Sequence, residues 1–105
     1  AAVLDRVRAV LEAAGPVEVR ATKSQVAFRR ARAFAWLWRP GQYLGAAVAP
    51  VVLSFALGRH DPSPRIKEVV HPSPSHWMHH LELRGVEEVD DEVVGWLVEA
   101  AGRAS

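Results

Sequence analysis

The sequence lacks cysteine altogether, and its 105 residues carry a formal net charge of only +1. The missing thiols exclude disulfides, a thiolate nucleophile and every cysteine-based zinc or iron–sulfur site. Disordered chains combine low hydrophobicity with high net charge, so the balanced charge and the 50% hydrophobic content exclude disorder. A chain of this length buries enough surface for one core, and we expect a single domain over residues 1–105.

We also expect neither a signal sequence nor a membrane-spanning segment. Residues 1–5 have neither the basic start nor the apolar stretch of a signal peptide, so we expect a cytoplasmic protein. The uncharged stretch 41–58 is interrupted by Gly45 and Pro50 and ends in a compact apolar run, 51–57. This content is typical of a loop followed by a buried strand, and we expect no membrane partner.

Two segments have the periodicity of amphipathic helices. Residues 1–14 place valine and leucine on one side of a helical wheel, and Gly15 and Pro16 then end the helix. A second helix is predicted after Val89, with Asp90 as its N-cap and further acidic residues in its first turn.

Between these helices the hydrophobic period changes to two, which predicts about six strands. The third and fourth strands are apolar on both sides. Proline-rich turns are expected at 61–64 and at 72–75. The strands are predicted at 17–22, 25–29, 33–38, 51–57, 66–71 and 76–84.

This order predicts an α+β fold, in which an antiparallel meander carries both helices on one face as a two-layer sandwich. Six strands span roughly 29 Å, and two helices of about 10 Å each nearly cover one face only. Strong curvature, the segment 39–50, a twin subunit or a ligand would have to occupy the second face.

The charge is unevenly distributed, because no acidic residue occurs between Val19 and His60. This stretch predicts a positive surface for an anion or a nucleic acid, unless the acidic residues near position 90 neutralise it. A ligand site on the uncovered face is predicted from Lys23, Arg29, Arg39, Trp36, Trp38 and His79. The nucleic-acid alternative uses Arg20, Lys23, Arg29, Arg30, Arg32 and Arg39.

No metal, cofactor or catalytic group is expected. His71, His76, His79 and His80 are close in sequence, but His76 and His80 lie some 13 Å apart on a strand, and His79 and His80 point to opposite faces. His79 shares a face with apolar neighbours, so we expect it to be at least half buried and to need a hydrogen-bond partner.

Nucleotide-binding and nucleophile motifs are equally weak. The glycines at 41 and 45 lack the Gly-Lys-Ser/Thr ending of a phosphate loop. Serines near His71 and His76 belong to a proline-containing turn, which needs no catalytic explanation.

Four segments carry a further pattern of strand and helix residues: 22–30, Phe34-Ala35-Trp36, 77–83 and 89–97. Together they resemble one bacterial family, the domain-of-unknown-function family numbered 5655. The resemblance extends from Val3 to Ala104 and implies no activity. Members of that family stand alone or at the C-terminus of longer bacterial proteins, sometimes alongside nuclease-like domains, which by resemblance slightly favours the nucleic-acid alternative.

The helix, sheet, helix order is also similar to the frataxin-like layout. Members of that group that handle iron have an acidic first helix, whereas here Asp5 and Glu12 are balanced by Arg6 and Arg8. Iron delivery is therefore not expected from this chain.

Three functions of different classes follow from the sequence. The favoured one is a non-enzymatic binding module, either as a homodimer or with a partner domain, whose basic and aromatic sheet face receives an anionic ligand or protein. The alternatives are a nucleic-acid accessory domain and, less favoured, a small enzyme.

Overall fold

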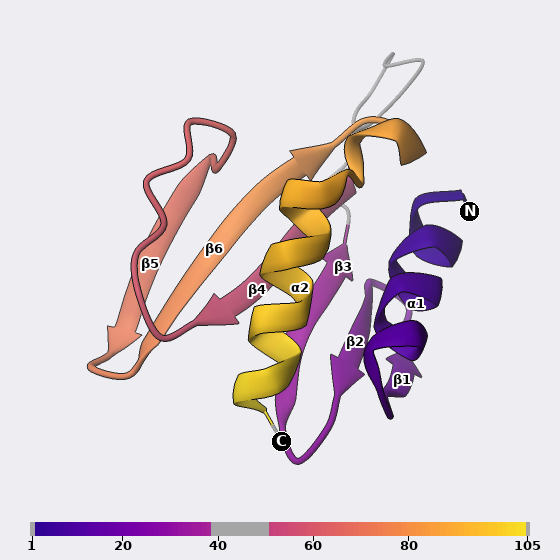
Figure 1. The fold of residues 1–105 in the computed structure, drawn as a ribbon, viewed down its shortest axis with the longest axis horizontal. Coiled ribbons are helices and arrows are strands. Elements are labelled where there is room, and N and C mark those ends of the chain that lie inside the picture. The colour runs from indigo at the N-terminus through magenta and orange to yellow at the C-terminus, as the bar shows by residue number, and fades with distance from the viewer. Residues whose placement is uncertain (1, 39–50, 105) are drawn as a thin grey trace.

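The structure, a computed structural model, describes residues 2–38 and 51–104. Two helices flank a six-stranded sheet, which confirms the predicted α+β class (Figure 1). The predicted strand positions agree with the structure to within about two residues, and a short 3₁₀ helix before the last helix was not predicted. The elements are α1 (Ala2–Ala14), β1 (Glu18–Ala21), β2 (Gln25–Arg29), β3 (Ala33–Trp38), β4 (Val51–Leu57), β5 (Glu68–Ser73), β6 (His76–Leu83), η1 (Val86–Glu88) and α2 (Asp91–Arg103).

The sheet is antiparallel throughout, with the order β1-β2-β3-β4-β6-β5. The predicted meander is therefore correct through β4 and wrong for the last two strands. After β4 the chain first forms β5, which is the edge strand. It then turns back to form β6, which lies between β4 and β5. The apolar side chains of β6 are thus placed beside β4, at the centre of the sheet, where they are buried.

The helix ends follow the local chemistry that the sequence indicated. Gly15, which follows α1, has a positive φ of 146°, a conformation that glycine adopts without strain. At α2, the side chain of Asp90 accepts a hydrogen bond from the Val93 amide at 3.2 Å. The Arg65 guanidinium, 2.9 Å from the Asp90 carboxylate, holds the pKa of that carboxyl below its usual range.

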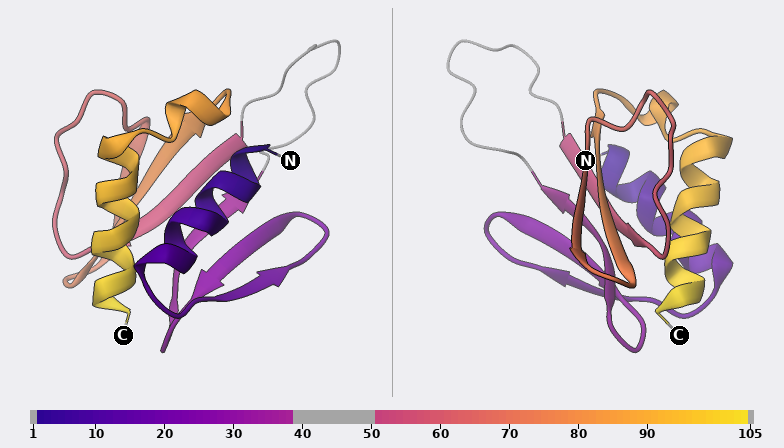
Figure 2. Two further views of the ribbon diagram at one scale, coloured as in Figure 1. Left: turned by 45° about the vertical axis from the view of Figure 1, so that its right-hand side comes forward. Right: turned by 90° about the vertical axis from the view of Figure 1, so that its left-hand side faces the viewer.

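Both helices lie on the same face of the sheet, as the two views in Figure 2 show. The core between them includes Val7 and Leu11 of α1, Leu97 of α2 and Leu53 and Phe55 of β4, all of which are 0% exposed. Burial of these apolar side chains is the main stabilising contribution to such a two-layer fold. The opposite face receives no helix from the described part of the chain.

The turn predicted at 72–75 is shorter in the structure. β5 continues through Pro72 to Ser73, and the turn consists of Pro74 and Ser75. Proline lacks an amide donor and is tolerated in a strand mainly at a sheet edge, which is the position that β5 occupies.

None of the helices in the described ranges is both long and apolar enough to cross a membrane.

Candidate functional site

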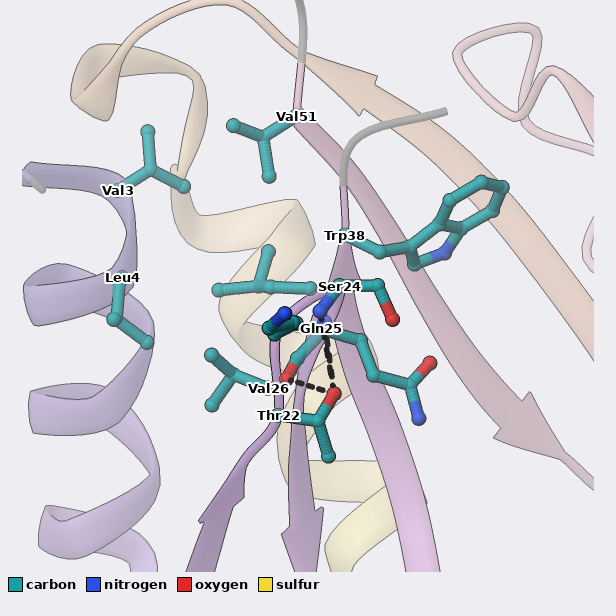
Figure 3. A pocket seen from close by; sticks show the side chains of 10 residues that line it. Val3, Leu4, Thr22, Ser24, Gln25, Val26, Trp38 and Val51 are labelled. Atoms are coloured by element: carbon teal, nitrogen blue, oxygen red, sulfur yellow. Dashed lines mark hydrogen bonds between the residues drawn. The ribbon is translucent and has the colours of Figure 1, made fainter. Parts of the chain in front are cut away.

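The sheet face that points away from the helices, termed the open face, carries the aromatic residues that the sequence singled out. Cross-strand pairing places Trp36 beside Ser54, Ser54 beside His80, and Trp38 beside Val52. Paired residues of an antiparallel sheet share a face, so these five side chains lie together. Figure 3 shows the Trp38 side chain directed away from α1. The prediction that Trp36 and Trp38 lie on a face without helices is confirmed.

A hydrogen-bonded network lies at the centre of the open face. The Trp38 indole Nε1 donates to Ser54 Oγ at 2.8 Å, and Ser54 Oγ lies 2.7 Å from His80 Nδ1. The rings of Trp38 and His80 meet edge to face, with centroids 6.3 Å apart. Ser54 is 4% exposed, so its hydroxyl hydrogen is best used toward Nδ1, which leaves the other imidazole nitrogen as the donor.

A serine within hydrogen-bond distance of histidine also occurs in hydrolases, but this arrangement does not favour nucleophilic attack. The Ser54 oxygen is buried and already accepts the indole hydrogen of Trp38, which reduces its electron density. His80 donates no hydrogen bond to a carboxylate within the described part of the chain. A catalytic triad needs that third group. The network instead fixes the ring orientations on the open face.

Three shallow hollows adjoin one another across the open face. We name them the basic, central and mixed hollows. The basic and central hollows share Trp36 and Met78, and the central and mixed hollows share Trp38 and His80. The basic hollow, of about 190 Å³, is lined by Arg32, Ala33, Phe34, Trp36, Ala56, Pro72, His76, Met78 and Arg103. The central hollow, of about 210 Å³, is lined by Gln25, Trp36, Trp38, Ser54, Met78 and His80. The mixed hollow, of about 230 Å³, is lined by Trp38, Val52, Lys67, Glu68, His80, Leu81 and Glu82.

The basic hollow combines positive charge with an unused polar atom. Arg32 donates to the Arg103 carbonyl at 2.8 Å, and Arg103 donates to the Ser75 carbonyl at 2.7 Å. Both partners are neutral, and no carboxylate side chain of the described residues lies within ion-pair distance of either guanidinium. The buried Nδ1 of His76 has no hydrogen-bond partner among the described residues. These groups can together bind an anion.

His79, predicted on the same face as Trp36 and Trp38, lies on the opposite face. The register pairs His79 with Phe55, and the two rings stack in the core with centroids 5.3 Å apart. His79 is 0% exposed, and its Nε2 accepts a hydrogen bond from the Asp61 amide at 3.0 Å. Its Nδ1, 2.9 Å from the Trp77 carbonyl, is then the donor. Its burial and its need for hydrogen bonds are confirmed, whereas its place in the ligand site is wrong.

Burial lowers the pKa of His79, because a charged imidazole is costly to place among apolar groups. The unfolded chain binds this proton near pH 6.5, whereas the folded chain binds it only at lower pH. We therefore expect the free energy of unfolding to fall by up to about 1.4 kcal/mol per pH unit below pH ~6.5. Urea denaturation between about pH 7.5 and pH 5 measures this slope.

The variant His79→Gln should show a flatter slope over the same range, even though it is less stable at neutral pH. The variant His71→Gln, at an exposed position of β5, serves as the control and should keep the wild-type slope. A wild-type slope retained in His79→Gln would show that other groups cause the pH dependence.

The remaining residues of the predicted ligand site are dispersed. Lys23 lies in the turn between β1 and β2, where it lines a pocket beside α1. Arg29 lies on β2 with its Nε 3.8 Å from the Glu18 carboxylate, so its charge is partly balanced. Arg39 lies outside the described residues.

The predicted nucleic-acid set likewise does not form one patch. Arg30 donates to the carbonyls of Ala14, Pro16 and Ala101, and so joins the C-terminal ends of both helices. Arg20 pairs with Glu18 at 3.0 Å. Of this set, Arg32 is the residue that lines a hollow on the open face.

The residues of the open-face hollows that were absent from the predicted ligand and nucleic-acid sets include Ser54, His76, His80 and Arg103. A serine within a strand that is apolar on both sides was a detectable signal, because a buried hydroxyl needs partners. Arg103 could not be found in this way, since only the fold brings the end of α2 beside β3. Within the described residues, no cluster of three or more side chains is arranged to hold a metal ion.

Comparison with known proteins gives one match. The model of a family described as "Domain of unknown function (DUF5655)" matches residues 1–101. The chain belongs to this family. Membership in DUF5655 confirms the resemblance seen in the sequence, and its description assigns no activity. No curated protein and no solved structure matches, so the similarity to the frataxin-like layout stays a prediction.

Proposed function

We propose that this member of DUF5655 is a small binding module, and not an enzyme, that receives an anionic ligand on its open face. The anionic group would enter the basic hollow, and the rest of the ligand would extend over Trp36 into the central hollow. The observation that carries the proposal is the pair of guanidiniums that have no carboxylate partner among the described residues, next to an aromatic face that no described helix covers.

The chemistry of the basic hollow favours an anion over a neutral ligand. Arg32 and Arg103 each retain donors beyond the one that bonds a backbone carbonyl, because a guanidinium has five. Hydrogen bonds from guanidinium to phosphate or carboxylate are charge-assisted and about twice as strong as neutral ones. Trp36 adds an aromatic surface on which a planar group can stack.

A nucleic-acid accessory domain is the second candidate. Arginine beside an aromatic ring is the combination that binds single strands, and Arg32 and Trp36 line one hollow. The engagement of Arg30 with the helix ends and of Arg29 with Glu18 reduces the basic surface available to a polyanion. We therefore rank a small anionic ligand first.

Titration with pyrophosphate and with adenosine monophosphate tests the proposal, with tryptophan fluorescence and amide NMR shifts as readouts. We expect saturable binding, with shifts at Trp36, His76 and Arg103. Arg32→Gln should weaken binding about tenfold, because one charge-assisted hydrogen bond is lost. The control Arg84→Gln, at an exposed arginine that follows β6, should leave binding unchanged.

Three outcomes would decide against the small-ligand proposal. Absence of saturable binding by either anion would overturn it. Binding of a single-stranded oligonucleotide that is much tighter than either anion, and that weakens steeply with salt, would favour the second candidate. An equal loss of anion affinity in Arg32→Gln and Arg84→Gln would also contradict it. The affinity would then depend on the total charge of the protein and not on the basic hollow.

The association state and the location are part of the same proposal. A homodimer through the open face would place the basic hollow of one copy near the acidic residues of the mixed hollow of the other. Light scattering over a dilution series distinguishes this dimer from a monomer. A bacterial, cytoplasmic protein stays our expectation from the sequence.

A further inference from the structure

A second pocket lies beside α1 and shares Gln25 and Trp38 with the central hollow of the open face. It is the space between the first turn of α1 and the adjacent ends of β2, β3 and β4, with a volume of about 310 Å³ (Figure 3). This volume is at the lower limit of pockets that bind small molecules. The residues that line this α1 pocket are Val3, Leu4, Thr22, Lys23, Ser24, Gln25, Val26, Leu37, Trp38 and Val51.

The interior of the α1 pocket is apolar. Figure 3 shows Val3 and Leu4 of α1 on one side, with Val26 and Val51 across from them. These four side chains are only half-buried, although they contact the core. Water in such a space finds few hydrogen-bond partners, so an apolar guest that displaces it is favoured.

Among the described residues, one positive charge lines the pocket beside this apolar surface. Lys23 is exposed and forms no ion pair with any of them, and none of the described lining residues is acidic. The Thr22 hydroxyl is already used: it donates to the Gln25 carbonyl and accepts from the Gln25 amide, each at 3.2 Å. The polar side-chain groups that remain for a ligand include the Lys23 ammonium, the Ser24 hydroxyl and the Gln25 amide.

We propose that the α1 pocket binds a short- to medium-chain fatty carboxylate in its free form. The hydrocarbon tail lies between Val3 and Leu4 on one side and Val26, Leu37 and Val51 on the other. The carboxylate lies at Lys23, where the charges are complementary. This site is separate from the basic hollow and does not depend on the function proposed above.

The experiment measures binding of hexanoate, octanoate and decanoate to the whole chain by calorimetry, below the concentrations at which they form micelles. We expect the affinity to rise about fourfold for each methylene group until the pocket is full. Amide NMR shifts should be largest at Val3, Leu4, Val26 and Val51. Decyltrimethylammonium, which has the same tail and the opposite charge, should bind more weakly than decanoate.

Two variants separate the roles of charge and tail. Lys23→Gln should weaken decanoate binding two- to fivefold, the range of an exposed ion pair, and leave decanol binding unchanged. Lys67→Gln, at an exposed lysine of the mixed hollow, is the matched control and should have no effect. Leu4→Gln should weaken decanoate and decanol alike, with circular dichroism verifying that the variant is folded.

Three results would overturn this proposal. The first is an absence of saturable decanoate binding by the wild-type chain. The second is an affinity that does not depend on chain length. The third is decanoate binding that Leu4→Gln leaves unchanged in a folded protein. Pyrophosphate binding, measured on the same variants, tests the basic hollow separately, because Lys23 and Leu4 do not line it.

Discussion

Replacement of Asp61 by alanine is expected to lower the free energy of unfolding by about 3 kcal/mol, because buried donors lose their acceptor. Its carboxylate accepts from the Trp96 indole at 2.9 Å, from Arg59 at 3.0 Å and from the Ser63 amide at 2.9 Å. Trp96 is 4% exposed, so its N–H would be left without water or another partner. Urea denaturation followed by circular dichroism measures the change.

The Asp61 carboxylate also makes stability depend on pH in acid. Burial raises its pKa, but the hydrogen bonds from Ser63, Trp96 and Arg59 outweigh this effect and hold the pKa below its usual range. A carboxyl with a lowered folded pKa stabilises fully above the unfolded value, near pH 3.8, and this stability is lost as pH falls through the folded pKa. The free energy of unfolding of Asp61→Ala should therefore not show this decrease in acid.

Two comparisons make the Asp61 prediction specific. Asp61→Asn keeps one acceptor oxygen for Trp96 and should cost less than the alanine variant. Asp91→Ala, at an exposed position in the first turn of α2, should change stability by less than about 1 kcal/mol. If Asp61→Ala were no more destabilising than Asp91→Ala, the hydrogen-bonding role of Asp61 would be refuted.

Replacement of Phe55 by alanine should cost more, about 3 to 5 kcal/mol. Phe55 is 0% exposed and stacks between His79 and Trp96, with centroid distances of 5.3 and 5.4 Å. It therefore joins the central strand to α2, and its removal leaves a cavity that those rings cannot easily fill. Thermal and urea denaturation measure the loss.

Phe55→Leu is the matched comparison, because leucine refills most of the space without the aromatic contacts. We expect it to cost about half as much as the alanine variant. A loss below about 2 kcal/mol for Phe55→Ala would mean that the core collapses around the missing ring, in contradiction to the rigid stack. Ser54 precedes Phe55 and faces the other way, so the fluorescence of Trp38 also reports whether the open face is disturbed.

The element order and the doubly apolar strands were predictable, because both depend on periodicity within one segment. The alternation along β6 correctly grouped His79 with Leu81 and Leu83. What alternation does not define is which group of β6 meets the tryptophans of β3, because that depends on the register through β4. The structure places His80 on that face, so the sequence assigned the wrong histidine of β6 to the face that carries Trp36 and Trp38.

The basic stretch shows a second limit of prediction from sequence. A run without acidic residues indicates a positive surface only if its side chains remain available to a ligand. Arg30 instead satisfies carbonyls at the ends of α1 and α2, groups that a helix leaves without internal partners. Arg103 completes the basic hollow although it lies 71 positions after Arg32, and no local pattern indicates this contact.

The two outer strands of the sheet determine how another polypeptide can associate with it. At one edge, Pro72 removes an amide donor from β5, and at the other edge β1 is only four residues long and carries Glu18 and Arg20. Proline, short strands and exposed charges each oppose the templating of a further strand from another chain. The sheet is therefore protected against edge-to-edge aggregation. We therefore expect a partner polypeptide to contact the side chains on a face of the sheet, because backbone pairing with an edge strand is disfavoured.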